Sequence, residues 1–114
     1  MSKIPTIFHI ANDEDIRQYH ESGEYRCASL DSEGFIHCCD KHQLKGVVSR
    51  YYSDADNLHL VIINPDKLTG PLIHENTVGG SELFPHVYSV INTDAIISIE
   101  PFGLDSTERL NLSE

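Results

Sequence analysis

The sequence has few basic residues and no cluster of them. Lys and Arg together number 8 in 114 residues, against 18 Asp and Glu, so the formal net charge is −10. A surface of this sign repels nucleic-acid backbones and anionic membranes. We therefore do not expect extended nucleic acid as a partner, and any anion site must use one or two of the scattered cations.

Long apolar runs and a cysteine framework are also missing. No window approaches the roughly 18 consecutive apolar residues that cross a bilayer, and the Met-Ser-Lys-Ile-Pro start has no apolar signal-peptide core. Three cysteines, two of them adjacent at Cys38 and Cys39, do not make a disulfide framework. These absences predict a soluble, cytoplasmic protein with free thiols and no membrane contact.

The composition that remains is that of one ordinary folded domain. Hydrophobic residues make up 39% of the chain, with five Tyr and four Phe but no Trp, and 114 residues suit a single core. No repeat or interdomain linker interrupts the sequence. We expect a single α+β domain.

Periodicity and turn residues predict where the elements lie. Asn12 and the acidic residues after it predict a helix that begins at Asp13 and ends at Gly23. Asp40 and Gln43 form a capping-box pattern before a second helix over 44–52. Apolar segments predict strands over residues 4–10, 25–29, 35–39, 57–64, 71–75, 87–90 and 95–99. We expect a turn at 31–34, a surface loop over 78–86 and a loosely ordered polar tail over 103–114.

Seven histidines are the unusual feature of so short a chain. Four of them, His9, His37, His74 and His86, lie in or beside predicted strands, which suggests a shared cleft. The alternative is that each is a structural histidine with one satisfied hydrogen bond. We place His42, together with His59, in that structural class.

Neither a metal site nor a cysteine nucleophile is predicted around His37. His37, Cys38, Cys39, Asp40 and His42 are all metal-ligand types. On a strand, however, Cys38 points away from its two neighbours, and the spacing does not match paired zinc ligands. Adjacency on a strand is also not the hydrogen-bonded contact that activates a thiolate. Metal binding is thus the least favoured alternative.

Several motifs, taken in order and spacing, resemble the DUF952 family, whose function is unassigned. The resemblance spans residues 4–102, so we expect a DUF952-like domain over 1–102 and the tail after it. It is most specific at Gly-Phe-Ile-His and Phe-Pro-His-Val-Tyr. The motifs are Ile7-Phe-His-Ile10, Tyr25-Arg-Cys-Ala-Ser-Leu30, Glu33-Gly-Phe-Ile-His-Cys38, Gln43, Arg50-Tyr51 and Leu83-Phe-Pro-His-Val-Tyr88.

The resemblance implies two short facing sheets around a central cleft with two main helices, similar to the ADP-ribosyltransferase superfamily and its RNA 2′-phosphotransferase branch. In that superfamily two residues bracket the nicotinamide and its ribose, and His9 and His37 fit their places. NAD is therefore a candidate cofactor. The chain differs from the superfamily in the Ile-Ala that follows His9 and in having few arginines placed for phosphate; Arg50, with Arg26, is the candidate.

These observations lead to a transferase-like enzyme or ligand-binding domain that takes NAD, another nucleotide or a phosphorylated metabolite. We assign ligand binding to His9, Ser29, Gln43 and Arg50, and catalysis to His37, His86 and Glu75. Arg50 would neutralise a phosphate, and His37 or His86 would transfer a proton because imidazole titrates near neutral pH. The alternative is a non-catalytic domain whose histidines line a groove for a ligand or partner protein. The substrate and oligomeric state stay open.

Overall fold

A four-stranded antiparallel sheet with strand order β4-β1-β5-β9 carries the largest part of the core. Its two central strands are buried on both faces, which explains their nearly continuous apolar sequence. In β5, Val61 and Ile63 face one core cluster, whereas Leu58 and Leu60 face another. The strands are β1 (Ile7–Ala11), β4 (Cys39–Asp40), β5 (Leu58–Ile63) and β9 (Ile96–Phe102).

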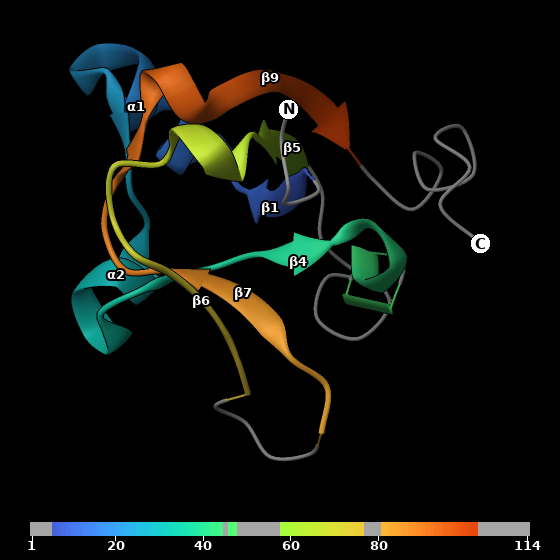
Figure 1. Cartoon of the computed structure of the whole chain (residues 1–114). Helices are drawn as coiled ribbons and strands as arrows, with labels where there is room; N and C mark the ends of the chain where they lie inside the picture. Colours follow the sequence, from blue (N-terminus) through green and yellow to red (C-terminus); the bar gives the residue numbers. More distant parts are fainter. Residues whose placement is uncertain (1–5, 45, 48–57, 77–80, 103–114) are drawn as a thin grey trace.

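The computed structural model describes residues 6–44, 46–47, 58–76 and 81–102. Within these residues the chain forms two further antiparallel sheets, with orders β3-β7-β6 and β2-β8. Figure 1 shows β6 and β7 apart from the layer of β1, β5 and β9, with β4 between them. The strands are β2 (Glu24–Tyr25), β3 (Ile36–His37), β6 (Leu72–Glu75), β7 (Phe84–Val87) and β8 (Ile91–Asn92).

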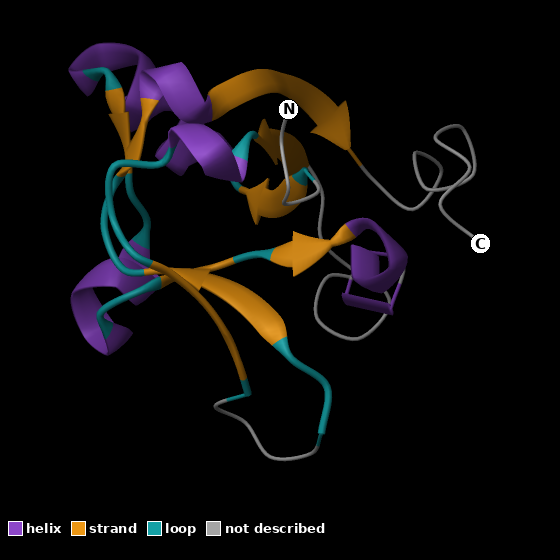
Figure 2. Cartoon of the chain, in the orientation of Figure 1, coloured by secondary structure: helices purple, strands orange, loops and turns teal. Residues whose placement is uncertain are grey.

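The arrangement confirms a single α+β domain. Its described residues include the expected helix α1 and the unexpected helix α2, and a third, two-stranded sheet accompanies the two that were expected. Figure 1 labels α1 and α2 on the same side of the view, and Figure 2 shows the helices in purple and the strands in orange. Three short 3-10 helices complete the described elements: Lys41–Gln43, Pro65–Lys67 and Thr93–Ala95. No helix in the described ranges is long and apolar enough to cross a membrane.

Helix α1 (Asp13–Ser22) confirms the predicted start and end. The Asn12 side chain accepts a hydrogen bond from the Asp15 amide, and Gly23 ends the helix in the left-handed conformation with φ of 83°. Ile16 and Tyr19 pack on the core. The first turn is acidic, which suits the positive end of the helix dipole.

The prediction of a strand over 25–29 and a turn over 31–34 is wrong. The strand ends at Tyr25, and α2 (Ala28–Glu33) follows. Gly34 adopts a φ of 91° and its amide donates to the carbonyls of Ser29 and Leu30, so it ends a helix instead of forming an isolated turn. Six residues are too short for a clear helical period in the sequence.

The expected strand over 35–39 is two strands that belong to different sheets. Ile36 and His37 pair with β7, whereas Cys39 and Asp40 pair with β1. Phe35 and His37 do share a face, with ring centroids 4.8 Å apart. Cys39 does not join them, because the chain crosses from one sheet to the other at Cys38.

The predicted surface loop over 78–86 is wrong at its end, where Phe84–Val87 form β7 at the centre of a sheet. Glycines and Pro85 gave this segment its turn-like composition, but pairing with β3 and β6 on both sides overrides that local preference. Of the strand expected over 87–90, only Val87 lies in a strand, as the last residue of β7. Strands over 57–64, 71–75 and 95–99 are confirmed, with β9 longer than expected.

The capping box at Asp40 and Gln43 is present, and residues 44 and 46–47 are helical. The rest of the predicted helix over 44–52, including Arg50, lies outside the described residues. So do residues 1–5 and the tail over 103–114.

Replacing Gly34 by alanine is expected to lower the free energy of unfolding by about 1 kcal/mol, because only glycine adopts the left-handed conformation without strain. Urea denaturation measures the change. The matched control is Ser32→Ala, an exposed position inside α2, where alanine should be neutral or slightly stabilising. Equal stabilities for the two variants would contradict the cap assignment.

Candidate functional site

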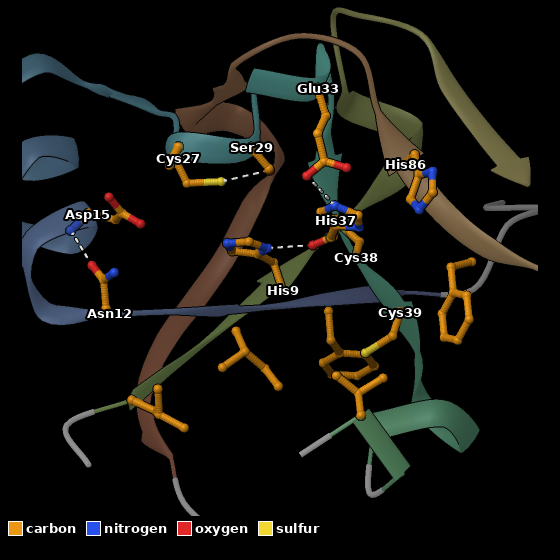
Figure 3. Close-up of a pocket in the computed structure, with 16 residues that line it drawn as sticks. His9, Asn12, Asp15, Cys27, Ser29, Glu33, His37, Cys38, Cys39 and His86 are labelled. Atoms are coloured by element: carbon orange, nitrogen blue, oxygen red, sulfur yellow. Dashed lines mark hydrogen bonds and ion pairs between the residues drawn. The ribbon is translucent and has the colours of Figure 1, made fainter. Parts of the chain in front are cut away.

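A cavity of about 550 Å³ opens where the edge of β1 loses its neighbouring strand. β4 pairs only with Ile7 and Phe8, so the edge of β1 from His9 onward faces α2, the β3–β4 segment and β7 instead. The volume falls in the range of about 300–1,000 Å³ that is usual for small-molecule sites. Figure 3 shows the side chains that line it.

Four of the seven predicted site residues line this one cavity: His9, Ser29, His37 and His86. Glu75 is not in the lining, but its carboxylate accepts a hydrogen bond from Nδ1 of His86. Gln43 does not line the cavity, and Arg50 lies outside the described residues. The histidines predicted to share a cleft therefore do so, except for His74, which is exposed on β6.

His9 is buried and uses both ring nitrogens inside the protein. Its Nδ1 lies 2.6 Å from the carbonyl oxygen of His37, and its Nε2 lies 2.6 Å from the hydroxyl of Tyr25. A carbonyl only accepts, so Nδ1 carries the proton and Nε2 accepts from Tyr25. Burial lowers the pKa of His9 to about 4. The ring is thus a neutral link between β1, β2 and β3.

His86 is held by a carboxylate. Its Nδ1 donates to Glu75 at 2.9 Å, and the Tyr88 hydroxyl donates to the same carboxylate oxygen. These bonds, first that from Tyr88 and then that from His86, lower the pKa of Glu75. The His86 ring also stacks on Phe35 with centroids 4.2 Å apart. Both contacts fix its orientation.

The second nitrogen of His86 is not used within the described part of the protein. There Nε2 has no hydrogen-bond partner, although only 3% of the side chain is exposed. No fully buried side-chain nitrogen or oxygen in the described part lacks a partner, so Nε2 keeps some exposure. His86 is also one of the residues that line the cavity.

His37 stands at the open side of the cavity, between His86 and α2. Its ring packs edge to face against that of His86, with the ring centroids 5.0 Å apart. Its Nε2 lies 3.1 Å from a carboxylate oxygen of Glu33. Glu33 lies four residues earlier, near the end of α2, which explains why the two side chains meet. In Figure 3 the Glu33 carboxylate points down onto His37.

The polar groups of Ser29 and Gln43 are engaged within the protein. The Ser29 hydroxyl donates to the Phe35 carbonyl at 2.8 Å. Gln43 is buried, and its amide donates to the Leu83 carbonyl at 2.7 Å while its oxygen accepts from the Asp40 amide. Gln43 thus ties the 3-10 helix Lys41–Gln43 to the segment before β7.

Sequence reasoning did not select Asp15, Asn12, Glu33 or Tyr25. Asp15 and Asn12 were interpreted as a helix start, a role that Asn12 indeed has, yet both also line the cavity. Partial burial and the nearby Glu14 raise the pKa of Asp15. The Tyr25 contact with His9 joins positions 16 residues apart and has no local signal.

The adjacent Cys38 and Cys39 show no features of a nucleophile. Burial raises the pKa of Cys39 to about 12 and that of Cys38 well above its ordinary value, so both are thiols at neutral pH. In the described ranges no three His, Cys, Asp or Glu side chains converge so as to hold a metal ion.

Comparison with known proteins gives a family and a fold. The model of the family described as "Protein of unknown function (DUF952)" matches residues 10–99. The crystal structure of protein CC0527 from Caulobacter crescentus is similar, with 21% identity, a TM-score of 0.75 and 85% of each chain covered. Its solution NMR structure has 21% identity and a TM-score of 0.72, covering 86% of this chain and 84% of that one. No curated protein matches the chain.

The buried neutral His9 predicts a loss of stability in acid. The unfolded ring takes up a proton near pH 6.5 and the folded one only near pH 4, so stability falls as pH drops between these values and is constant below them. The loss from this group is at most about 3 kcal/mol. Urea denaturation across this range should show a smaller loss in His9→Gln, which cannot titrate.

The control for this comparison is His20→Gln, which removes an exposed histidine from α1. It should keep the acid-dependent loss of the unmodified protein. If His9→Gln loses as much stability in acid as His20→Gln, the neutral, buried state of His9 is contradicted.

Proposed function

The chain belongs to the DUF952 family, whose function is unknown, and from its site we propose that it is a small enzyme that binds a nucleotide-like molecule in the histidine-lined cavity. The observation that carries the proposal is the Glu75–His86 pair. A carboxylate holds Nδ1 of a buried imidazole that lines a cavity of ligand size, and Nε2 has no partner in the described part of the chain.

This pair has the arrangement of a general base or acid. With Nδ1–H bonded to Glu75, Nε2 of neutral His86 carries a lone pair and can accept a proton from a bound hydroxyl or amine. The imidazolium that forms is stabilised by the Glu75 carboxylate, which the Tyr88 hydroxyl keeps in place. His37, in contact with the His86 ring, lies where it would touch the same molecule.

A transferase-like reaction on NAD or another nucleotide is the finer form of this proposal. It is supported by the resemblance to the ADP-ribosyltransferase superfamily, which pairs His9 with His37, and by the presence of both residues in the lining of one cavity. In this proposal His9 positions the β3 backbone rather than bonding the ligand, because both of its nitrogens are used. Binding of a phosphorylated group by Arg50 rests on the sequence.

Non-catalytic ligand binding is the second candidate. It is favoured by the internal hydrogen bonds of His9, Ser29 and Gln43, which leave these side chains without free donors for a ligand. The two candidates share the cavity and differ only in whether His86 transfers a proton.

Titration of NAD, AMP and ADP, followed by amide NMR, tests the proposal. Millimolar ligand should shift resonances of β1, α2 and β7, and His37→Ala together with His86→Ala should weaken binding by about tenfold, as expected when a cavity contact is lost. The matched control is His74→Ala, an exposed histidine of the same sheet. The nucleotide proposal fails if no resonance shifts at millimolar ligand.

Release of nicotinamide from NAD, measured by chromatography, separates catalysis from binding. If His86 is the proton-transfer group, His86→Ala should lower the rate by about 10²- to 10⁴-fold, with a smaller loss in Glu75→Gln. His74→Ala should keep the full rate. Binding without any release of nicotinamide would favour the second candidate.

A further inference from the structure

The cavity has a continuous apolar end. Its apolar lining residues belong to one packed cluster on the face of β1 opposite His9. In Figure 3 the labelled polar side chains lie mainly on one side of the β1 ribbon, and the unlabelled apolar ones lie mainly on the other. The apolar residues are Phe8, Ile10, Val47, Leu58 and Phe84. An apolar ring or chain would bury its surface here.

The polar end presents hydrogen-bond acceptors. Nε2 of His86 is an unpartnered acceptor in a nearly buried ring, since Nδ1–H is already donated to Glu75. The Asp15 carboxylate lines the same cavity, is half-buried, and has no hydrogen bond or ion pair with any described residue. This carboxylate lies in the first turn of α1, where the helix dipole favours its charge, and it is available to a ligand that supplies a donor.

Most side-chain donors in the lining are already used within the protein. Ser29 donates to the Phe35 carbonyl, His9 donates to that of His37, and the ring of His37 is paired with Glu33. The side-chain amide of Asn12 is the donor left at the rim, since its oxygen accepts from the Asp15 amide. No Lys or Arg is found among the described residues of the lining.

From these contacts we infer that the cavity selects a ligand with an apolar, ring-bearing body and an ammonium head group. The ammonium group would donate hydrogen bonds, and the Asp15 carboxylate would be its counter-charge. The inference deepens the proposed function, because it concerns the same cavity. A nucleotide would accordingly insert its amino- or hydroxyl-bearing part and leave its phosphates outside the described lining.

A matched set of three small probes tests this selection: benzylamine, benzyl alcohol and benzoate. They share one ring and differ in head charge. In amide NMR titrations near neutral pH and at low salt, benzylamine should bind at least about fivefold more tightly than benzoate, which is the effect of one partly exposed ion pair. Benzyl alcohol should fall between them.

Asp15→Asn should weaken the binding of benzylamine by about fivefold and change the affinity for benzyl alcohol by less than about twofold. The control is Glu21→Gln, which removes an equal charge from an exposed position of the same helix and should keep the order of the probes. Salt provides a test without mutation, because screening should weaken benzylamine and leave the alcohol unchanged.

Three results would overturn the inference: benzoate binding as tightly as benzylamine, an order that survives in Asp15→Asn, or no binding of any probe at about 20 mM. None of them decides the proposed function, which depends on the nucleotide titration and on the His86 variants. Conversely, selection of benzylamine with no nucleotide binding would support the inference and remove the nucleotide proposal.

Discussion

The rest of the site depends on the two hydrogen bonds of the His9 ring. These bonds join the Tyr25 hydroxyl of β2 and the His37 carbonyl of β3 to the central strand β1. Three sheets are thereby connected through one buried ring. A neutral imidazole suits this place because it is both donor and acceptor, and burial keeps it neutral by lowering its pKa to about 4.

The chemistry of the site follows from what this link leaves available. Because His9 and Ser29 are satisfied within the protein, the acceptors left for a ligand in the described lining include Nε2 of His86 and the carboxylate of Asp15. One is held in place by Glu75, and the other lacks a partner in the described part of the chain. His86 of β7 and Asp15 of α1 thus determine which ligand the cavity can bind and which proton transfer it can support.

Local signals predicted the elements whose ends are fixed by neighbouring residues. Helix α1 was predictable because Asn12 and Gly23 cap it, and β5 because a six-residue segment with five apolar residues is bounded by Asn and Pro. Helix α2 was missed because six residues give too little periodicity. Strand β7 was taken for a loop because Pro85 reads as a turn, although partners on both sides hold it in a sheet.

The sequence by itself determined a small acidic α+β domain, its family, and the histidines that form the site, because composition, capping residues and motifs are properties of short segments. Only the tertiary structure decided their roles. His9 became a neutral structural link, Glu75 the partner of His86, and Asp15 part of the cavity. Each role depends on burial and on contacts between residues distant in the chain. Neither burial nor long-range contacts are encoded in the local sequence.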